Sequence, residues 1–414
     1  IELYSQKIGE HISSVDIVDT ENLIGRCVVS GNVRRSAALA MGKHDDIHYL
    51  EMKNDSEKLM HHRWGSNNSF NAVVGMDYTW HANQSQKNGE PGYIWLENAR
   101  TRGRFKDGER LDDINVAGFN PCVEQQLEDA ELCCLVETFP AKHENMEDYL
   151  RTLKIAYLYG KTITLSNTHW PETNAKMLKN RRIGLSQSGV VQAFNKHGRR
   201  EMYKWCDQAY QFVQKLDEEY SNWLCIPKSI RTTSIKPSGT VSLLNGSTPG
   251  IHFPEDEYYI RRIRFSTDSH LIEPLRAAGY TIEKDVYSPN TVCVEFPVHE
   301  PYFVKGKRDV NMWEQLEIAA QYQHYWADNS VSITVTFKPE EAESIKDALE
   351  MYESRLKAVS FLRYEETGYE QAPYEPITKE QYNKLIKNIN PVTKISTNEE
   401  GTGSKFCTND SCTI

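Results

Sequence analysis

The chain has 414 residues, of which 39% are hydrophobic and 26% are charged, and its formal net charge is −10. This composition is ordinary for a globular protein; no apolar run approaches the roughly 18 residues of a membrane span, no signal-peptide pattern opens the chain, and the acidic balance argues against a broad nucleic-acid-binding surface. Nine cysteines without a secretion signal predict a reducing, cytoplasmic compartment, where paired cysteines are more often catalytic than structural.

Predicted helices and strands alternate through the second half of the chain. Asn145–Tyr159 carries apolar residues at helical spacing and predicts a helix, whereas Lys161–Ser166 predicts a strand. The same pair recurs as a predicted helix at Glu314–Asp328 and a half-buried strand at Val331–Phe337. Pro339 then suits the first turn of a further helix. Strands separated by helices of this length predict an α/β fold with parallel strands.

The first motif with chemical potential is Asn120-Pro121-Cys122-Val123-Glu124. Its amide, thiol and carboxylate alternate along the chain, so they share one side of an extended strand or loop tip. On its own the motif is weak evidence, because cysteine is often simply buried. A cysteine hydrolase would need a nearby histidine, and the next one downstream is His143.

A second motif is the pair Cys407 and Cys412, near the end of a polar tail at residues 391–414. A structural disulfide would stabilise no folded segment there. A zinc site would need four ligands, and the tail offers two thiols and no histidine. The favoured interpretation is a dithiol on a flexible arm that exchanges with a disulfide elsewhere.

Two further stretches could bind phosphate. Lys236–Thr240 and Gly246–Gly250 place small hydroxyl residues around glycine, where backbone N–H groups can approach an anion, although two ordinary turns would give the same letters. Gly31–Ala37 contains the pair Arg34 and Arg35, which suits phosphate, although taken alone the pair is more typical of solvated surface charge.

Together these features resemble the ribonucleotide reductases, most closely the monomeric, adenosylcobalamin-dependent branch that reduces triphosphates. Eight stretches occur in the family's order: GNVRRSA (31–37), SNNSF (66–70), NPCVEQQLEDAELCCLVETFP (120–140), HWPETN (169–174), NRRIG (180–184), KPSGTVSLLNGSTPGIHFP (236–254), YWADNSVSITVTF (325–337) and the tail cysteine pair. The resemblance implies a ten-stranded α/β barrel over residues 1–390, lacking its N-terminal strands, with a finger loop at about 118–126 and a redox tail at 391–414.

The resemblance also implies roles for single residues. Cys122 matches the cysteine that becomes the thiyl radical, Glu124 the base that takes the 3′-hydroxyl proton, and Asn120 the amide that hydrogen-bonds the ribose. Cys133 matches one of two cysteines that reduce the 2′ position and finish as a disulfide. Cys407 and Cys412 match the tail dithiol that re-reduces this disulfide and is itself reduced by thioredoxin.

Ligands follow from the same resemblance. The substrate would be a ribonucleoside triphosphate, the effector a deoxyribonucleoside triphosphate and the cofactor adenosylcobalamin, with no metal held by protein side chains. The implied substrate-phosphate residues are Pro237, Ser238, Gly239, Thr240, Thr248 and Gly250. The implied effector and specificity loop contains Asn32, Arg34, Arg35 and Ser36.

Some features depart from the family pattern. The second reducing cysteine would lie N-terminal to everything here, because Cys27 is too close to the arginine pair, so we expect a fragment. Cys134 is expected to be a passenger beside Cys133. The tyrosine pair of the oxygen-dependent branch is absent from the tail, and Gly368-Tyr369 mimics only part of the anaerobic branch's motif. A catalytically inactive, nucleotide-binding regulatory relative and a diphosphate-reducing member remain as alternatives.

Overall fold

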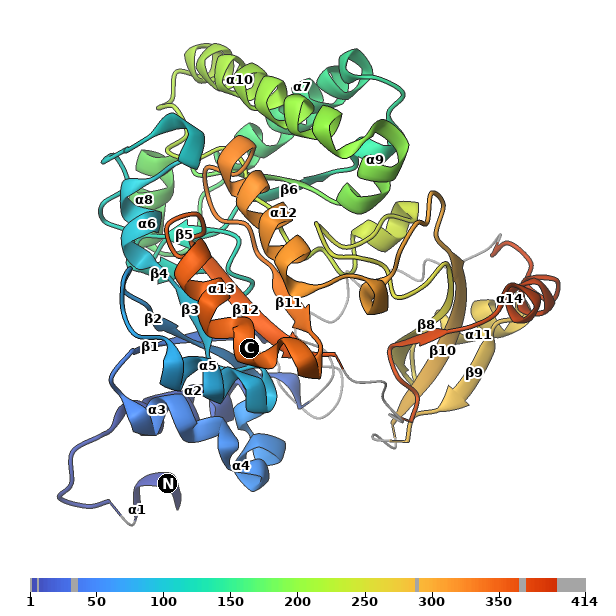
Figure 1. Cartoon of the computed structure of the whole chain (residues 1–414), viewed down its shortest axis with the longest axis horizontal. Coiled ribbons are helices and arrows are strands. Elements are labelled where there is room, and N and C mark those ends of the chain that lie inside the picture. The colour runs from blue at the N-terminus through green and yellow to red at the C-terminus, as the bar shows by residue number, and fades with distance from the viewer. Residues whose placement is uncertain (1, 6, 31–35, 287–289, 365–369, 393–414) are drawn as a thin grey trace. The chain divides into compact units, whose positions relative to one another are not determined.

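The computed structural model describes residues 2–5, 7–30, 36–286, 290–364 and 370–392 (Figure 1). The chain forms two compact units. The larger comprises Ile1–Ile24, Ala37–Phe253 and Val310–Tyr364, and the smaller Gly25–Ser36, Pro254–Asp309 and Glu365–Ile414. Among the helices in the described ranges, none combines the length and apolar character needed to cross a membrane.

The larger unit contains a five-stranded sheet in the order β1-β2-β3-β12-β11. Its strands are β1 (Ala38–Lys43), β2 (Ser66–Asn71), β3 (Gly92–Ile94), β12 (Ala358–Arg363) and β11 (Thr334–Phe337). β1, β2 and β3 are parallel, β12 runs antiparallel to β3, and β11 is parallel to β12. The sheet therefore consists of two parallel sets that meet in one antiparallel pair.

The strand pairing extends beyond this sheet through single bridges. β6 (Leu135–Thr138) pairs in parallel with β7 (Gly184–Gln187). A parallel bridge joins Leu185 to Thr233, and another joins Ile235 to Val331, three residues before β11. The pairings thus connect eight strand segments of the described chain in one series. The α/β class is confirmed, and a closed ten-stranded barrel stays a prediction.

Helices pack on these strands and on one another. α7 (Met146–Ile163) lies against β6 and packs along α10 (Arg199–Leu224), as Figure 1 shows, while α12 (Met312–Tyr325) contacts both α10 and β11. Large aromatic side chains fill the space between them, including the fully enclosed Tyr149 and Trp326. The other helices of this unit and at its borders are α1 (Glu2–Ser5), α2 (Ser14–Val29), α3 (Ile47–Glu51), α4 (Ser56–His61), α5 (Thr79–Asn88), α6 (Leu96–Thr101), α8 (Pro171–Asn180), α9 (Val190–His197) and α13 (Ile345–Tyr352).

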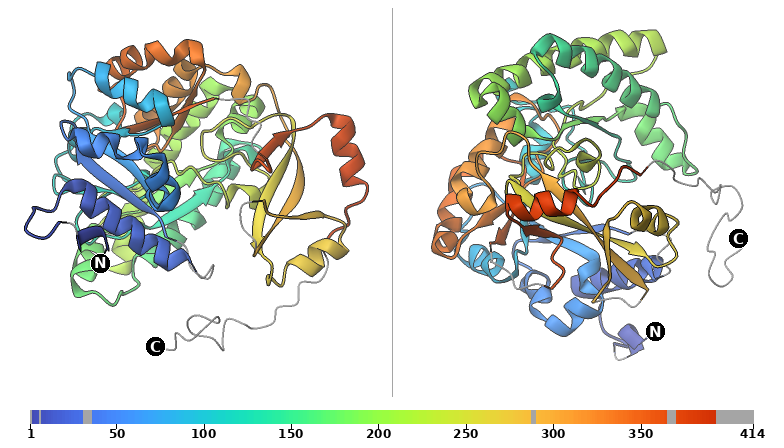
Figure 2. Two further views of the ribbon diagram at one scale, coloured as in Figure 1. Left: turned by 90° about the horizontal axis from the view of Figure 1, so that it is seen from below. Right: turned by 90° about the vertical axis from the view of Figure 1, so that its right-hand side faces the viewer.

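The smaller unit is an antiparallel sheet in the order β13-β8-β10-β9. Its strands are β8 (Tyr258–Ser266), β9 (Thr281–Lys284), β10 (Thr291–His299) and β13 (Tyr374–Pro376), and it also contains α11 (Ile272–Ala277). α14 (Lys379–Ile386) packs on β8 and β10, as the views in Figure 2 show. The predicted boundary between residues 390 and 391 stays a prediction, because residues 393–414 lie outside the described ranges.

Most predicted elements are confirmed, and one is wrong. α7 begins at the predicted point, where the Asn145 side chain accepts a hydrogen bond from the Asp148 N–H at 3.0 Å. The predicted strand Lys161–Ser166 is wrong, because α7 continues to Ile163. The reason is tertiary: Lys161 is buried, and its ammonium lies 2.6 Å from Asp217 of α10. This ion pair outweighs the strand preference of the threonine- and isoleucine-rich stretch.

The later predictions differ from the structure mainly at their ends. α12 (Met312–Tyr325) confirms the predicted helix, and β11 with the Val331 bridge confirms the strand. Pro339 opens a 3-10 turn, Pro339–Ser344, before α13 begins.

Candidate active site

The Asn-Pro-Cys-Val-Glu motif forms the tip of a short hairpin. β4 (Gly118–Phe119) pairs antiparallel with β5 (Gln126–Leu127). The Asn120 side-chain oxygen accepts a hydrogen bond from the Gln125 N–H at 3.0 Å, and its carbonyl accepts one from the Val123 N–H at 2.8 Å. Asn120 therefore shapes the turn, and these bonds bring the amide, the thiol and the carboxylate to one tip.

Val123 carries backbone strain at this tip. Its φ is 64°, in the left-handed region, where a β-branched residue is a genuine outlier. Such conformations persist only where the surrounding structure enforces them, and they concentrate at functional sites. Here the strain lies next to the thiol of Cys122.

Lys236 joins the two reactive groups of the hairpin. Its Nζ lies 3.0 Å from Glu124 Oε1 and 3.6 Å from Cys122 Sγ. Glu124 is fully buried, and its Oε2 has no hydrogen-bond partner within the described structure. Burial lowers the pKa of Lys236, but the negative charge of Glu124 outweighs it, so the pKa is raised overall. The site therefore holds an ion pair with one free carboxylate oxygen.

Cys133 and Glu137 belong to the same cluster. Cys133 is exposed, yet partial desolvation and the charge of Glu124 raise the pKa of its thiol, and Lys236 opposes this rise. Glu137, on β6, accepts hydrogen bonds from Ser188 at 2.6 Å and Ser186 at 3.1 Å. Burial raises the pKa of Glu137 to about 7 despite these hydroxyls and Lys236. Two thiols, two carboxyls and one ammonium thus influence one another.

Cys134 lies beside Cys133 on the chain, and its role as a passenger stays a prediction. It is buried, its Sγ lies 3.6 Å from the Gly160 carbonyl oxygen, and burial raises its pKa to about 11.

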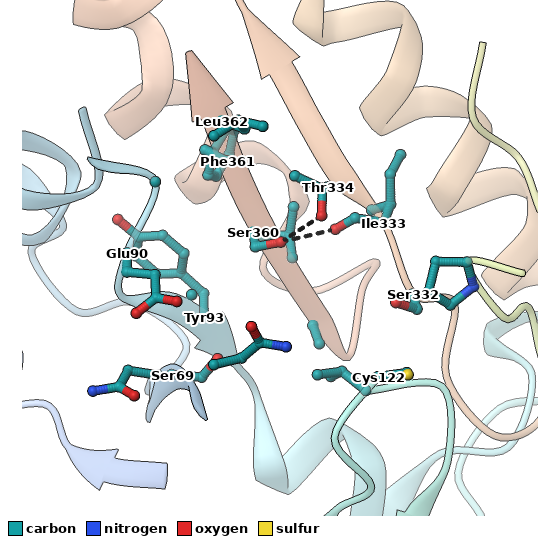
Figure 3. A pocket seen from close by; sticks show the side chains of 18 of the residues that line it. Ser69, Glu90, Tyr93, Cys122, Ser332, Ile333, Thr334, Ser360, Phe361 and Leu362 are labelled. Carbon is teal, nitrogen blue, oxygen red and sulfur yellow. Dashed lines mark hydrogen bonds between the residues drawn. The ribbon is translucent and has the colours of Figure 1, made fainter. Parts of the chain in front are cut away.

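Cys122 also lines a cavity of about 340 Å³ on the larger unit. Figure 3 shows Glu90, Tyr93 and Ser69 on one side of this cavity, Ser332 and Thr334 on the other, and Cys122 at its edge. Gly89, Gly92 and Asn68 also line it, and the Asn68 side-chain nitrogen is buried without a partner among the described residues. The cavity therefore offers the thiol a neighbouring space with an unused hydrogen-bond donor.

The proposed phosphate residues form two adjacent loops. The hydroxyls of Ser238, Ser247 and Thr248 are buried, and none has a hydrogen-bond partner within the part of the chain that is described. Gly250 donates its N–H to Ser188 at 3.0 Å, and its φ of 51° places a hypothetical Cβ 2.5 Å from the Lys236 carbonyl oxygen. Glycine is therefore required where the two loops meet.

Three more of the residues predicted to bind phosphate adjoin Ser238 on the chain. Pro237 lines the cavity beside Cys122. Gly239 and Thr240 follow in the turn that leads to the 3-10 segment Ser242–Asn245.

Several predicted positions cannot be placed. Asn32, Arg34 and Arg35 of the effector loop, and Cys407 and Cys412 of the tail, lie outside the described residues. Ser36 is described and exposed, between α2 and β1. The structure brings together Asn120, Cys122, Glu124 and Cys133.

The sequence assigned no role to three contributors, although Lys236 and Ser247 lie within the stretches predicted to bind phosphate. Lys236 was visible as the first letter of the KPSGT stretch, but nothing in the sequence linked it to the hairpin. Glu137 lies on β6, shortly after Cys133 on the chain, and nothing in the sequence linked it to the site. Ser247 directly precedes the predicted Thr248 and shares its unpartnered, buried hydroxyl.

Known proteins resemble this chain over nearly its whole length. It is 48% identical over 423 residues to a probable adenosylcobalamin-dependent ribonucleoside-triphosphate reductase of Dictyostelium discoideum, covering 100% of this chain and 56% of that protein. The adenosylcobalamin-dependent ribonucleoside-triphosphate reductase of Euglena gracilis is 46% identical, with 98% and 57% covered, and that of Lactobacillus leichmannii is 39% identical, with 94% and 57% covered. No family model matches the chain.

Solved structures agree with these sequence relatives. A crystal structure of a B12-dependent, class II ribonucleotide reductase superposes with a TM-score of 0.85 at 36% identity, covering 94% of this chain and 59% of that one. The α subunit of a class Id ribonucleotide reductase from Actinobacillus ureae reaches a TM-score of 0.57 at 14% identity, which shows a shared fold alone. The chain spans less than two thirds of the length of the relatives it matches. In sequence and in fold, this chain belongs with the adenosylcobalamin-dependent ribonucleotide reductases.

Proposed function

We propose that the protein containing this chain reduces ribonucleoside triphosphates to 2′-deoxyribonucleoside triphosphates by thiyl-radical chemistry, with adenosylcobalamin as cofactor. The observation that carries the proposal is the hairpin tip, where Cys122 and the buried Glu124 share one ammonium and Glu124 keeps a free oxygen. A ten-stranded barrel around this tip is part of the proposal. It is supported by the eight connected strand segments and would shield a radical from water.

The cavity beside Cys122 suits the reactive part of such a cofactor. Its volume of about 340 Å³ is at the lower end of the range for small-molecule sites, so it fits a nucleoside-sized group rather than a whole corrinoid. Asn68 offers an unpartnered side-chain nitrogen there. Adenosylcobalamin, when bound, supplies the radical that removes a hydrogen atom from a thiol, which is the hard step that a cofactor carries.

The residues of this chain then divide the remaining work. Cys122 gives up the hydrogen atom of its thiol, and its sulfur takes the 3′-hydrogen of the ribose. The free Oε2 of Glu124 accepts the 3′-hydroxyl proton, and the Asn120 side chain contributes a hydrogen bond to the ribose. Cys133 and a second thiol supply two electrons and two protons, so that the 2′-hydroxyl leaves as water and a hydrogen takes its place, and these thiols end as a disulfide. Cys122 then returns the hydrogen atom to C3′, and Glu124 returns the proton to the 3′-oxygen.

Partners of the reaction follow the same proposal. The unpartnered hydroxyls of Ser238, Ser247 and Thr248 would receive substrate phosphate oxygens, since buried polar groups normally have partners. The tail thiols Cys407 and Cys412 would pass electrons from thioredoxin to the disulfide. Asn32, Arg34, Arg35 and Ser36 would link a deoxyribonucleoside triphosphate effector to base choice.

The test replaces Cys122 by serine in the enzyme expressed from its complete gene. We expect Cys122→Ser to abolish both nucleotide reduction and effector-dependent cleavage of the cobalt–carbon bond, followed by absorbance of cob(II)alamin. Glu124→Gln should lose about 10²- to 10⁴-fold in reduction and still permit cleavage, because only the base is missing. Cys225→Ser is the matched control, since this cysteine is exposed at the end of α10. Wild-type cob(II)alamin formation in Cys122→Ser would overturn the assignment.

A further inference from the structure

Lys236 reaches the hairpin from a firmly held backbone. Its N–H donates to Ser186 Oγ at 2.9 Å, and the preceding Ile235 forms the bridge to Val331. Its carbonyl oxygen lies so close to Gly250 that a Cβ there would be at 2.5 Å. The side chain therefore starts from a fixed point, and its ammonium ends between two reactive groups of another element.

The ammonium of Lys236 compensates the charge of Glu124 and determines which of its two carboxylate oxygens stays free. A carboxylate that is completely buried strongly favours its neutral form unless a cation compensates it. Lys236 supplies this compensation at 3.0 Å and occupies Oε1, which leaves Oε2 as the free acceptor. A protonated Glu124 would be a donor and could not accept a hydroxyl proton.

Two other titratable groups act electrostatically on this pair. Glu137 on β6 adds a second carboxyl, whose charge interacts with both Lys236 and Glu124, and Cys133 adds a thiol. The ammonium of Lys236 offsets these charges as well.

For Cys122, the same ammonium restricts the thiol hydrogen. An –NH₃⁺ group has three donors and no acceptor, so it can approach the sulfur only at a lone pair. With Lys236 Nζ at 3.6 Å on that side, the S–H bond points elsewhere. Cys122 also lines the cavity described above, so the thiol hydrogen is free to face it.

We infer that Lys236 is a positioning residue that keeps Glu124 ionised with one oxygen free and turns the thiol hydrogen of Cys122 away from the base. This inference rests on the proposed function, because it assigns the lysine to the reaction of that site. It also explains why a lysine begins the KPSGT stretch, whose following residues are proposed to bind phosphate.

The first test compares Lys236→Met with Lys236→Arg by nucleotide reduction between pH 5.5 and 9. We expect Lys236→Met to lose about 10²-fold or more in kcat at pH 7, with KM changed less than threefold, and its acid limb should move to higher pH. Lys236→Arg keeps the charge and should retain the wild-type limb. Combining Lys236→Met with Glu124→Gln should add little to the loss of Glu124→Gln alone, since both act through one group.

The matched control is Lys176→Met. Lys176 also pairs with a buried glutamate, Glu128, at 2.7 Å, but it lies outside the site. We expect its kcat and pH profile to equal those of the wild type. If Lys236→Met instead raised KM alone with an unshifted profile, Lys236 would be a phosphate ligand and the inference would be wrong.

A second measurement needs no turnover. The rate at which iodoacetamide alkylates Cys122, located by peptide mass spectrometry, should change several-fold in Lys236→Met and remain near wild type in Lys236→Arg, because the ammonium contacts the sulfur at 3.6 Å. Equal alkylation rates in all three proteins would overturn the inference, whatever the activity. Failure of the wild type itself to reduce nucleotides would instead overturn the proposed function.

Discussion

Glu137 Oε1 accepts a hydrogen bond of 2.6 Å from Ser188 Oγ, and Ser188 in turn accepts one from the N–H of Gly250 at 3.0 Å. This relay ties the carboxyl of β6 to the second of the two loops proposed to bind phosphate. Ser186, which donates to the same carboxyl, also receives the N–H of Lys236. Glu137 is therefore connected to both sides of the candidate site.

The raised pKa of Glu137 predicts a pH dependence of stability. Burial raises this pKa from 4.5 to about 7, so the folded protein binds a proton there that the unfolded chain releases between these values. The contribution of Glu137 to the free energy of unfolding should therefore be greatest below pH 4.5. It should fall by up to roughly 3 kcal/mol as the pH rises to about 7. Urea unfolding at pH 5 and 7.5 measures this loss of stability. The wild type should show it, and Glu137→Gln should not.

Glu128→Gln is the control for this experiment, because its shift has the opposite sign. Burial raises the pKa of Glu128, but hydrogen bonds from Lys176, Asn180 and Lys179 outweigh it and lower the pKa to about 2. Its contribution to stability is present above pH 4.5 and is lost only as pH falls toward about 2. Glu128→Gln should destabilise equally at pH 5 and 7.5 and retain the slope caused by Glu137. If stability depended on pH in Glu137→Gln as it does in the wild type, the raised pKa of Glu137 would be contradicted.

The strain at Val123 predicts an unusual response to glycine. A left-handed conformation costs an L-residue roughly 1–2 kcal/mol, and glycine avoids this cost but loses about 0.5–1 kcal/mol through backbone entropy. Val123→Gly should therefore change the free energy of unfolding by less than about 1 kcal/mol. Nucleotide reduction should fall several-fold, because the tip that carries Cys122 loses its restraint.

Val335→Gly is the matched substitution in an ordinary strand. Val335 is fully buried in β11, so the same change creates a cavity and should cost at least about 2 kcal/mol. Urea unfolding compares the two variants. Equal destabilisation by both would mean that Val123 is not strained in the folded protein.

The buried hydroxyl of Ser238 predicts a variant that changes nucleotide binding without lowering the free energy of unfolding. Its Oγ has no partner in the described structure, so Ser238→Ala removes no hydrogen bond and should leave the free energy of unfolding unchanged or raise it by up to about 1 kcal/mol. If this hydroxyl binds phosphate, KM for the nucleotide should rise about tenfold, the value of one hydrogen bond to a charged group.

Ser242→Ala gives the converse control. Its hydroxyl donates to the Ser238 carbonyl at 2.5 Å, so the variant should lose about 1 kcal/mol of stability and keep its KM. A normal KM in Ser238→Ala would remove this serine from the phosphate site.

The sequence predicted the parts of this molecule that depend on local patterns. The amphipathic spacing of Asn145–Tyr159 and the alternation of Val331–Phe337 each gave the correct element, because burial of one face determines both. Lys161–Ser166 failed, since the buried pairing of Lys161 with Asp217 cannot be read from neighbouring letters. Lys236 was missed for the same reason, as 112 residues separate it from Glu124.

The last prediction separates the tail cysteines from Cys133, and it rests on sequence because Cys407 and Cys412 lie outside the described residues. Their polar, glycine-containing surroundings suit delivery of electrons rather than the radical step. A Cys407→Ser/Cys412→Ser enzyme, pre-reduced, should convert about one substrate per active site and then stall with thioredoxin. Dithiothreitol should restore turnover, since thiol–disulfide exchange needs only thiolate access.

Cys133→Ser should differ already in the first turnover. The charges of Glu124 and Lys236 both act on the pKa of Cys133, and its role in reducing the 2′ position is the proposal that this variant tests. Pre-reduction cannot replace a missing thiol in that step, so the single-turnover yield should fall to background. The experiment is a single-turnover assay followed by multiple turnover with each reductant. Full thioredoxin-supported turnover in the tail double variant would remove the shuttle role, because electrons would then reach Cys133 without the arm.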